Sequence, residues 1–227
     1  MTLKIFTAVF ILLGCIACNM RRNGNADSAT GETISHNDKP APPYGLQDNA
    51  TGSDIVKKFV PGGYIILDSF SGNLNLDAYA DMILVLKQPG EDTLEMNFDE
   101  PVKRPLLILT GKEGGDYILA GRNDNAVLCR DCAGMFGDAF YGITIKDGYF
   151  SIEHVIAGGR HWQSVTTFKY NKEKADWYLY KEGYESYRMN DDTSPDAEAL
   201  VKDVESQKTV KDFGVVPFGK YNTYTEE

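Results

Sequence analysis

The sequence predicts a mainly β protein: one antiparallel β-rich domain, a meander that forms a sandwich or a partial barrel, with one or two short helices. Three observations support this fold class. Apolar runs of four or five residues recur between turn residues, as short strands do. An Asp-Gly pair separates two alternating segments, which is the favoured two-residue hairpin turn. Long helical segments do not alternate with the strands, so an α/β fold is not expected.

The first 17 residues have the composition of a secretory signal peptide. Lys4 gives a positive start, and Ile5 to Leu13 is an uncharged apolar run. This run is too short to cross a bilayer as a helix, which needs about 20 apolar residues. The chain is therefore expected to be exported and to lose residues 1–17.

Two cysteines, Cys15 and Cys18, follow the apolar run. A cysteine at this place resembles the lipobox of bacterial lipoproteins, and the resemblance implies that the cysteine is acylated and becomes the new N-terminus. Cys15 fits the leucine-first pattern better, whereas Cys18 gives a more usual signal length, and we take Cys18 as the first choice. The alternative is an ordinary cleaved signal with incidental cysteines. The lipobox implies a lipid-anchored membrane protein of the cell envelope, facing the periplasm or the cell exterior.

Residues 18–52 are predicted to be a flexible tether. They hold Asn, Asp, Ser, Gly, Thr and Pro with almost no aliphatic residues, so they bury too little apolar surface to offset their ordering entropy. The globular β-rich domain is expected over residues 53–218, beginning with a short helix capped by Ser53. Residues 219–227 are expected to be a frayed polar tail.

The expected strands of the first half are short apolar runs: Tyr64–Leu67, Met82–Leu86, Leu106–Leu109 and Tyr117–Ala120. Residues 140–180 are expected to form a four-stranded meander with a second turn at Gly158-Gly159. The turn at Asp147-Gly148 sets the register of its first hairpin, so that three pairs share one buried face. These pairs are Ile145 with Phe150, Ile143 with Ile152, and Tyr141 with His154. Ser194-Pro195-Asp196 resembles a helix start and predicts a short helix over Ala197–Val204.

The chain is acidic. It carries 23 Lys and Arg against 33 Asp and Glu, a net charge of −10. Removal of residues 1–17 removes one charge, Lys4, and leaves −11. An acidic domain repels phosphate backbones, because nucleic-acid affinity comes largely from cations that displace counterions. Nucleic acid is therefore not an expected partner.

An Asn/Asp-rich loop between the first two expected strands has the spacing of a calcium loop. Asn73, Asn75, Asp77 and Asp81 supply oxygens at positions 1, 3, 5 and 9, and Tyr79 supplies a carbonyl at position 7. The segment resembles the calcium loops of FG-GAP repeats in integrin-type propellers, but in a single copy. The resemblance implies a structural calcium site, and two neutral ligands make it weak. The alternative is a tight connection whose side chains bond their own backbone.

Cys129 and Cys132 form a C-x-x-C motif, and the other two cysteines belong to the signal region. Export favours a disulfide between them. The alternatives are free thiols, a thioredoxin-like redox pair at a helix start, and a zinc site completed by His154 and His161. The spacing fits no standard zinc finger, and His154 falls on the buried face of the meander, which favours a core histidine bonded to a neighbour. Residues 104–177 also resemble a group of uncharacterised envelope lipoproteins, which implies no activity.

A binding or interaction module is the favoured function. Aromatic residues make up 11% of the chain, and exposed ones stack on glycans or anchor a partner protein. Arg160, His161 and Trp162, at the second turn of the meander, are the candidate binding surface. The alternative for Trp162 is a place in the core. The expected partners are the membrane, through the lipid anchor, and an envelope protein or glycan.

An extracytoplasmic hydrolase of envelope glycans is the enzyme alternative, and a purely structural envelope component is the third. Glycosidases need two placed carboxylates, and Asp131, Asp138 and Glu153 are available. The motifs Gly-x-Ser-x-Gly, His-Glu-x-x-His and the P-loop do not occur. No catalytic residue is assigned, and an enzyme is the less favoured class.

Overall fold

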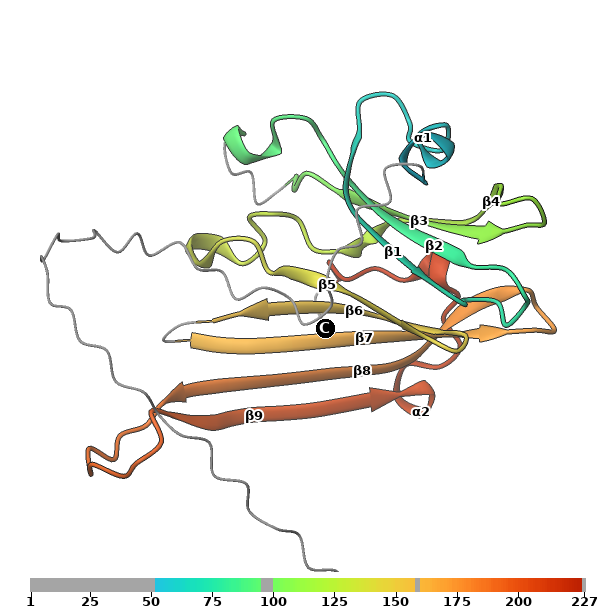
Figure 1. The fold of residues 1–227 in the computed structure, drawn as a ribbon. Coiled ribbons are helices and arrows are strands. Elements are labelled where there is room, and N and C mark those ends of the chain that lie inside the picture. Colours follow the sequence, from blue (N-terminus) through green and yellow to red (C-terminus); the bar gives the residue numbers. More distant parts are fainter. Residues whose placement is uncertain (1–51, 95–99, 158–159, 226–227) are drawn as a thin grey trace, which may run out of the picture. The chain divides into compact units, whose positions relative to one another are not determined.

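The computed structural model describes residues 52–94, 100–157 and 160–225 (Figure 1). Contacts divide the chain into two units, residues 1–47 and 48–227, and all described residues belong to the second. The predicted signal peptide, most of the predicted tether, Cys15, Cys18 and the turn at Gly158-Gly159 lie outside the described residues. Among the described helices, none has the length and apolarity needed to cross a bilayer.

The described chain is mainly β, as predicted, with two antiparallel sheets of consecutive strands. The first sheet contains β1 (Ile65–Gly72), β2 (Asp81–Lys87), β3 (Arg104–Gly111) and β4 (Tyr117–Val127). The second contains β5 (Phe140–Lys146), β6 (Tyr149–Ile156), β7 (Arg160–Asn171), β8 (Asp176–Met189) and β9 (Leu200–Thr209). The helices are α1 (Gly52–Lys57) and α2 (Val210–Phe213), with single 3-10 turns η1 (Glu91–Thr93), η2 (Gly134–Phe136) and η3 (Phe218–Lys220).

The two sheets share one core, so the sandwich is the architecture found. Its buried side chains come from both sheets and from the C-terminal segment: Leu74, Ile83, Val85, Leu106, Ile108, Ala126, Val127, Phe140, Ile143, Phe150, Ile152, Phe168, Trp177, Leu179, Phe218 and Tyr221. A second cluster joins Val56 of α1 to Leu84, Leu86, Leu107 and Leu109 on the other face of the first sheet. β2 and β3 are thus buried on both faces, which explains their continuous apolar runs. Because α1 begins at Gly52, Ser53 lies inside the helix and is not its cap.

Two of the three predicted pairs of the β5–β6 hairpin are confirmed: Ile145 with Phe150, and Ile143 with Ile152. The third is wrong, because His154 pairs with Phe140 and not with Tyr141. A β-bulge between Phe140 and Gly142 makes Tyr141 the extra residue. Its side chain is consequently 37% exposed, while Phe140 takes the core position at 8%.

The meander has five strands, and the helix predicted over Ala197–Val204 is wrong. β9 occupies this place and pairs with Lys181–Met189 of the long strand β8. A short polar segment is a marginal helix by itself, whereas pairing with β8 satisfies its backbone groups along most of its length.

The frayed tail expected beyond Gly219 is also incorrect for the residues described. Phe218 and Tyr221 are buried in the shared core. The Asn123 side-chain amide donates to the Tyr221 carbonyl at 2.8 Å, and the Tyr224 hydroxyl donates to the Val127 carbonyl at 2.8 Å. The C-terminal segment therefore closes one side of the sandwich.

Two strands of the second sheet, β7 and β8, are longer than the central strands of the first. β7 and β8 have 12 and 14 residues, whereas β2 and β3 have 7 and 8. At ~3.3 Å per residue, one end of the β7–β8 pair extends beyond the first sheet. Along the core face of β7, Phe168 and Thr166 are buried, while Ser164 and Trp162 are half-buried. The N-terminal end of β7 is therefore the open end.

Candidate functional site

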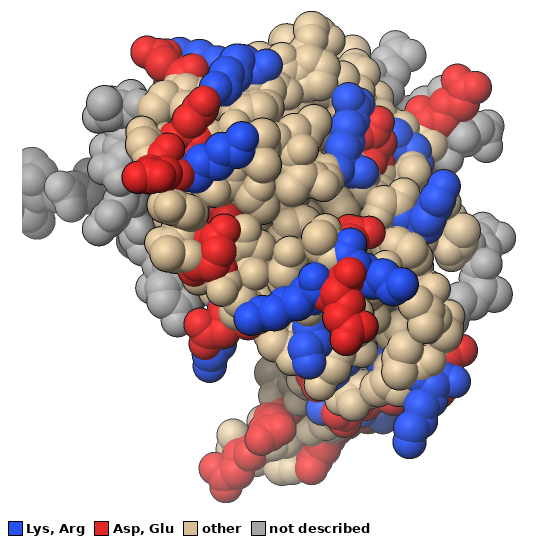
Figure 2. Space-filling model, turned by 90° about the vertical axis from the view of Figure 1, so that its right-hand side faces the viewer, with Lys and Arg blue, Asp and Glu red and all other residues tan. Residues whose placement is uncertain are grey.

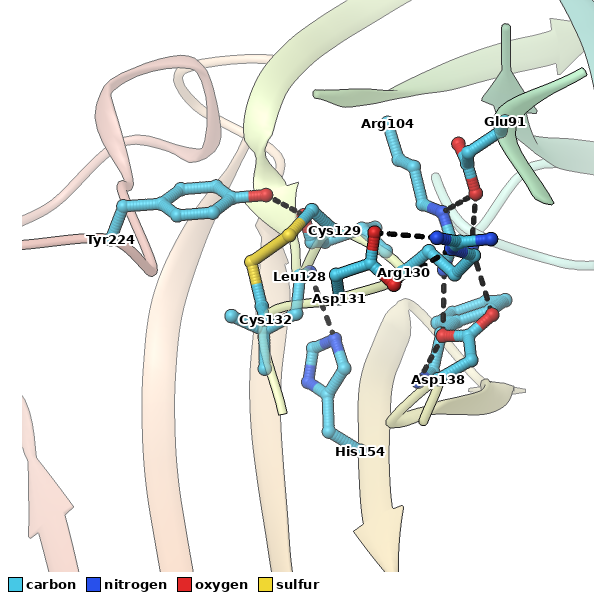
Figure 3. Close-up of a disulfide and its surroundings, with 12 residues drawn as sticks. Glu91, Arg104, Leu128, Cys129, Arg130, Asp131, Cys132, Asp138, His154 and Tyr224 are labelled. Carbon is cyan, nitrogen blue, oxygen red and sulfur yellow. Dashed lines mark hydrogen bonds and ion pairs between the residues drawn. A yellow bond between two sulfur atoms is a disulfide. The ribbon is translucent and has the colours of Figure 1, made fainter. Parts of the chain in front are cut away.

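A disulfide joins Cys129 to Cys132 directly after β4, and this confirms the predicted pairing (Figure 3). The backbone turns at once, since Cys132 N–H donates to the Cys129 carbonyl at 3.2 Å and Gly134 N–H donates to the Asp131 carbonyl at 2.8 Å. Residues 129–133 thus form turns and not the first turn of an α-helix. This geometry does not supply the helix start that a thioredoxin-like redox pair needs.

A buried ion cluster fastens this loop to the first sheet (Figure 3). Arg104, on β3, donates from Nε to Glu91 Oε1 at 2.9 Å and also contacts that oxygen through Nη2. Its Nη1 and Nη2 donate to the two carboxylate oxygens of Asp138 at 2.8 Å each. Arg104 and Glu91 are about as buried as any residue in the core, at 1% and 2% exposure. One cation thus joins η1, β3 and the end of the disulfide loop.

The cluster carries two carboxylates for one guanidinium. Burial opposes the charge of Arg104, but the hydrogen bonds to Asp138 and Glu91 outweigh burial and raise its pKa above the ordinary value. Glu91 Oε2 is buried without a hydrogen-bond partner. Glu91 therefore depends on Arg104, whereas Asp138 also accepts from Phe140 N–H at 3.0 Å. Sequence reasoning missed Glu91 and Arg104, because the three residues lie 13 and 34 positions apart and no local pattern joins them.

His154 is the core histidine that the sequence favoured. Its Nε2 accepts a hydrogen bond from Leu128 N–H at 3.1 Å, and its ring lies edge-on to Phe140 at 6.2 Å. Burial lowers the pKa of His154 to about 4, so the imidazole is neutral and free to accept this bond at ordinary pH. His154 thereby tethers the residue that precedes the disulfide.

The four residues considered for zinc do not come together as a ligand set. His161 lies on β7 with its ring edge-on to Tyr187 at 5.3 Å, while Cys129 and Cys132 bond each other. Within the described ranges, no group of three or more His, Cys, Asp or Glu side chains is placed to hold a metal ion.

The Asn/Asp-rich loop uses its side-chain oxygens on its own backbone. Asn73 Oδ1 accepts from Leu76 N–H at 2.7 Å, Asn75 Oδ1 from Asp77 N–H at 3.0 Å, and Asp77 Oδ1 from Tyr79 N–H at 2.7 Å. These bonds match the alternative of a self-bonded tight connection. Each of these oxygens has a second lone pair, and the calcium site that the FG-GAP resemblance implies stays a prediction.

Asp81 is the hub of this loop. Its buried carboxylate accepts three backbone N–H groups, from Leu74 at 2.6 Å, Asn75 at 3.1 Å and Gly111 at 2.9 Å. Burial raises the pKa of Asp81, while the three amides act in the opposite direction. Asp81 therefore ties the β1–β2 connection to the end of β3, a structural role with both oxygens occupied.

The three residues of the predicted binding surface do not form one surface. Arg160 is the first residue of β7, and its side chain is outside the description. His161 and Trp162 are neighbours in a strand and so project to opposite faces. His161 packs against Tyr187 on the outer face of the sheet, whereas Trp162 stacks on Tyr184 at 6.2 Å on the face that carries the core. Trp162 is half-buried, neither fully packed in the core nor free.

The acids considered for a glycosidase are engaged separately. Asp131 pairs with Arg130 at 2.8 Å, and Asp138 belongs to the buried ion cluster. Glu153 accepts from the Thr144 hydroxyl at 2.7 Å, on the opposite face of β6 from His154. The described structure does not bring two of them together as an acid–base pair.

Surface charges compensate each other locally. Figure 2 shows a face on which Lys and Arg side chains lie beside Asp and Glu. Pairs among the described residues include Lys58 with Asp116 at 2.6 Å and Arg122 with Asp124 at 2.7 Å. Exposed pairs of this kind contribute little stability, and the face in Figure 2 presents no extended field of one sign.

Comparison with known proteins identified no relative: no family model, no curated protein and no solved structure matches the chain.

Proposed function

We propose that the chain is a lipid-anchored envelope protein whose β-sandwich is an extracytoplasmic binding module. Export and lipid anchoring are supported by the charged start, the short apolar run and the cysteines of residues 1–18. The disulfide between Cys129 and Cys132 fits the same extracytoplasmic location, because disulfides persist outside the reducing cytosol.

Mass spectrometry of the protein from its native envelope tests the proposed signal cleavage and lipid anchor. We expect the mature chain to begin at an acylated Cys18, and Cys18→Ser to abolish the acyl mass while Cys15→Ser leaves it. The reverse pattern would move the anchor to Cys15. A chain that keeps Met1, or one without acyl mass, contradicts the proposal.

The binding surface that the geometry supports best is the core-side face at the open end of β7 and β8. We call Trp162, Ser164, Tyr184 and Ser186 the overhang surface. The register pairs Trp162 with Ser186 and Ser164 with Tyr184, so the four side chains lie on one face. This face continues the core, yet Tyr184 is 38% exposed. The single observation that carries the proposal is this stacked aromatic pair beyond the facing sheet.

The ligand class proposed for the overhang surface is a neutral glycan. Trp162 and Tyr184 provide apolar ring surface for the C–H faces of a sugar, and two serine hydroxyls beside them donate or accept hydrogen bonds. Two charged residues of β8 near this surface are engaged elsewhere: Glu182 accepts from the Tyr221 hydroxyl at 2.8 Å, and Arg188 pairs with Asp191 at 2.8 Å. An uncharged floor of rings and hydroxyls suits an uncharged, hydroxyl-rich ligand better than an ionic one.

Titration calorimetry with chitohexaose and cellohexaose tests this surface. Trp162→Ala and Tyr184→Ala are each expected to weaken binding about tenfold or more, since loss of an aromatic anchor costs about 1.4 kcal/mol or more. Tyr180→Ala, which removes an exposed tyrosine elsewhere on β8, is the matched control and should leave binding unchanged. Equal affinities for the wild type and both overhang variants, or no binding of either sugar, would reject the surface as a glycan site.

A further inference from the structure

The first half of β4 is an unguarded strand edge. β4 is the last strand of the first sheet, so no strand of the described residues pairs along its outer side (Figure 1). Tyr117-Ile118-Leu119-Ala120-Gly121 contains no charged residue. Ile118 and Leu119, which project to opposite faces of the strand, are 46% and 48% exposed. Unpaired backbone groups flanked by exposed apolar side chains are a template for another strand.

The other edges of the sandwich are protected. β9, the last strand of the second sheet, carries four charges in ten residues, at Lys202, Asp203, Glu205 and Lys208. β1 and β5 lie against each other at the opposite side, where Gly148 N–H donates to the Asn73 carbonyl at 2.9 Å. Charges and covered edges are the usual defences against pairing, and among the described residues neither protects Tyr117–Gly121. Its one irregularity is a β-bulge at Ala120, on the side that pairs with β3.

We propose that Tyr117–Gly121 pairs antiparallel with the same segment of a second copy of this chain. Such pairing has a two-fold axis, and the surface must be complementary to itself. With the axis at Leu119, Asp116 of each copy lies level with Arg122 of the other. Opposite charges thus flank an uncharged centre at both ends. Within each copy Asp116 pairs with Lys58 and Arg122 with Asp124, and these exposed pairs are weak enough to be exchanged for, or shared with, the contacts between copies.

The C-terminal segment sets the limit of this interface. Thr223 N–H donates to the Asn125 carbonyl at 2.9 Å, so the second half of β4 is already in contact with its own chain. About five residues of each copy remain for pairing, which buries less than the ~1,000 Å² typical of a stable interface. The dimer is therefore weak, and its contact is backbone pairing with two apolar side chains on each strand.

Cross-linking of the full chain in its native membrane fraction tests the proposal. Residues on the two-fold axis face their own copies at about 4.5–5.5 Å between Cβ atoms, a separation close to that of a disulfide. Leu119→Cys is expected to give a disulfide dimer on a non-reducing gel after mild oxidation. Val204→Cys is the matched control, since Val204 is 46% exposed on the edge strand β9, and it should stay monomeric.

Charge-reversal variants provide a second test of the proposed pairing. Adding Arg122→Asp to Leu119→Cys should reduce the cross-linked fraction severalfold, and adding Asp116→Arg as well should restore it. A monomeric Leu119→Cys protein, equal cross-linking of Val204→Cys, or a cross-link that Arg122→Asp leaves unchanged would each overturn the proposed pairing. The outcome does not depend on the glycan site or the lipid anchor, because the readout is contact between two copies.

Discussion

Replacement of Arg104 with alanine is expected to lower the free energy of unfolding by about 3–5 kcal/mol, the usual cost of removing one partner from a buried ion pair. Glu91 would lose both nitrogen donors that Arg104 directs to its Oε1, while its buried Oε2 has no hydrogen-bond partner. Asp138 would lose both guanidinium bonds. Urea unfolding of the full chain, followed by tryptophan fluorescence, measures the change.

Arg122→Ala is the control for this prediction. Arg122 makes a similar two-bond contact with Asp124, at 2.7 and 2.9 Å, but both side chains are 41% exposed. Its removal should cost less than about 1 kcal/mol. Adding Glu91→Gln and Asp138→Asn to Arg104→Ala should recover part of the loss, because the uncompensated charges disappear. An Arg104→Ala cost no larger than that of Arg122→Ala would show that the cluster is solvated and not structural.

The local pattern was sufficient for most strands. Asp147-Gly148 determines a two-residue turn, and alternation on either side of it fixed two of the hairpin's three pairs. The third pair failed at one residue, because a bulge at Tyr141 reverses which neighbour points inward. Nothing in the composition of Phe140-Tyr141-Gly142 distinguishes one aromatic residue from the other, and the core selects Phe140.

The missed strand and the packed tail have a common cause. Residues 200–209 are mostly polar, and their backbone is paired because β8 continues far enough to offer an edge. Tyr221 and Tyr224 are ordered through bonds to β4, about 100 positions earlier in the chain. Such long-range partners are invisible to periodicity, which reports only which face of an element is apolar.

The candidate sites divide in the same way. The disulfide and the role of His154 followed from spacing, export and the side of the strand on which His154 falls. His161 and Trp162 lie on opposite faces because successive side chains of a strand alternate. This alternation was visible in the sequence but was not used. The buried ion cluster and the overhang surface could be recognised only from the fold. The cluster joins three distant segments, and the overhang surface depends on the relative lengths of the strands in the two sheets.

Asp81→Ala is expected to destabilise the chain by about 3–5 kcal/mol, since three N–H groups lose one shared acceptor and each unsatisfied buried donor costs about 1–3 kcal/mol. Leu74, one of these donors, is fully buried in the core, and its carbonyl accepts the indole N–H of Trp177 at 3.0 Å. Loss of the Asp81 carboxylate should therefore loosen the core beside Trp177 and lower the melting temperature.

Asp81→Asn separates the role of the charge from that of the acceptor. An asparagine keeps one acceptor oxygen and removes the buried charge, so its cost should lie between those of the wild type and Asp81→Ala. Asp77→Ala is the matched control in the same loop, because Asp77 is exposed and accepts one backbone N–H, from Tyr79; it should cost about 1 kcal/mol or less. Calorimetric melting of the four proteins measures this order. If Asp77→Ala were as costly as Asp81→Ala, the stabilising element would be the exposed turn as a whole, and the buried carboxylate would lose its role as the tie between β1, β2 and β3.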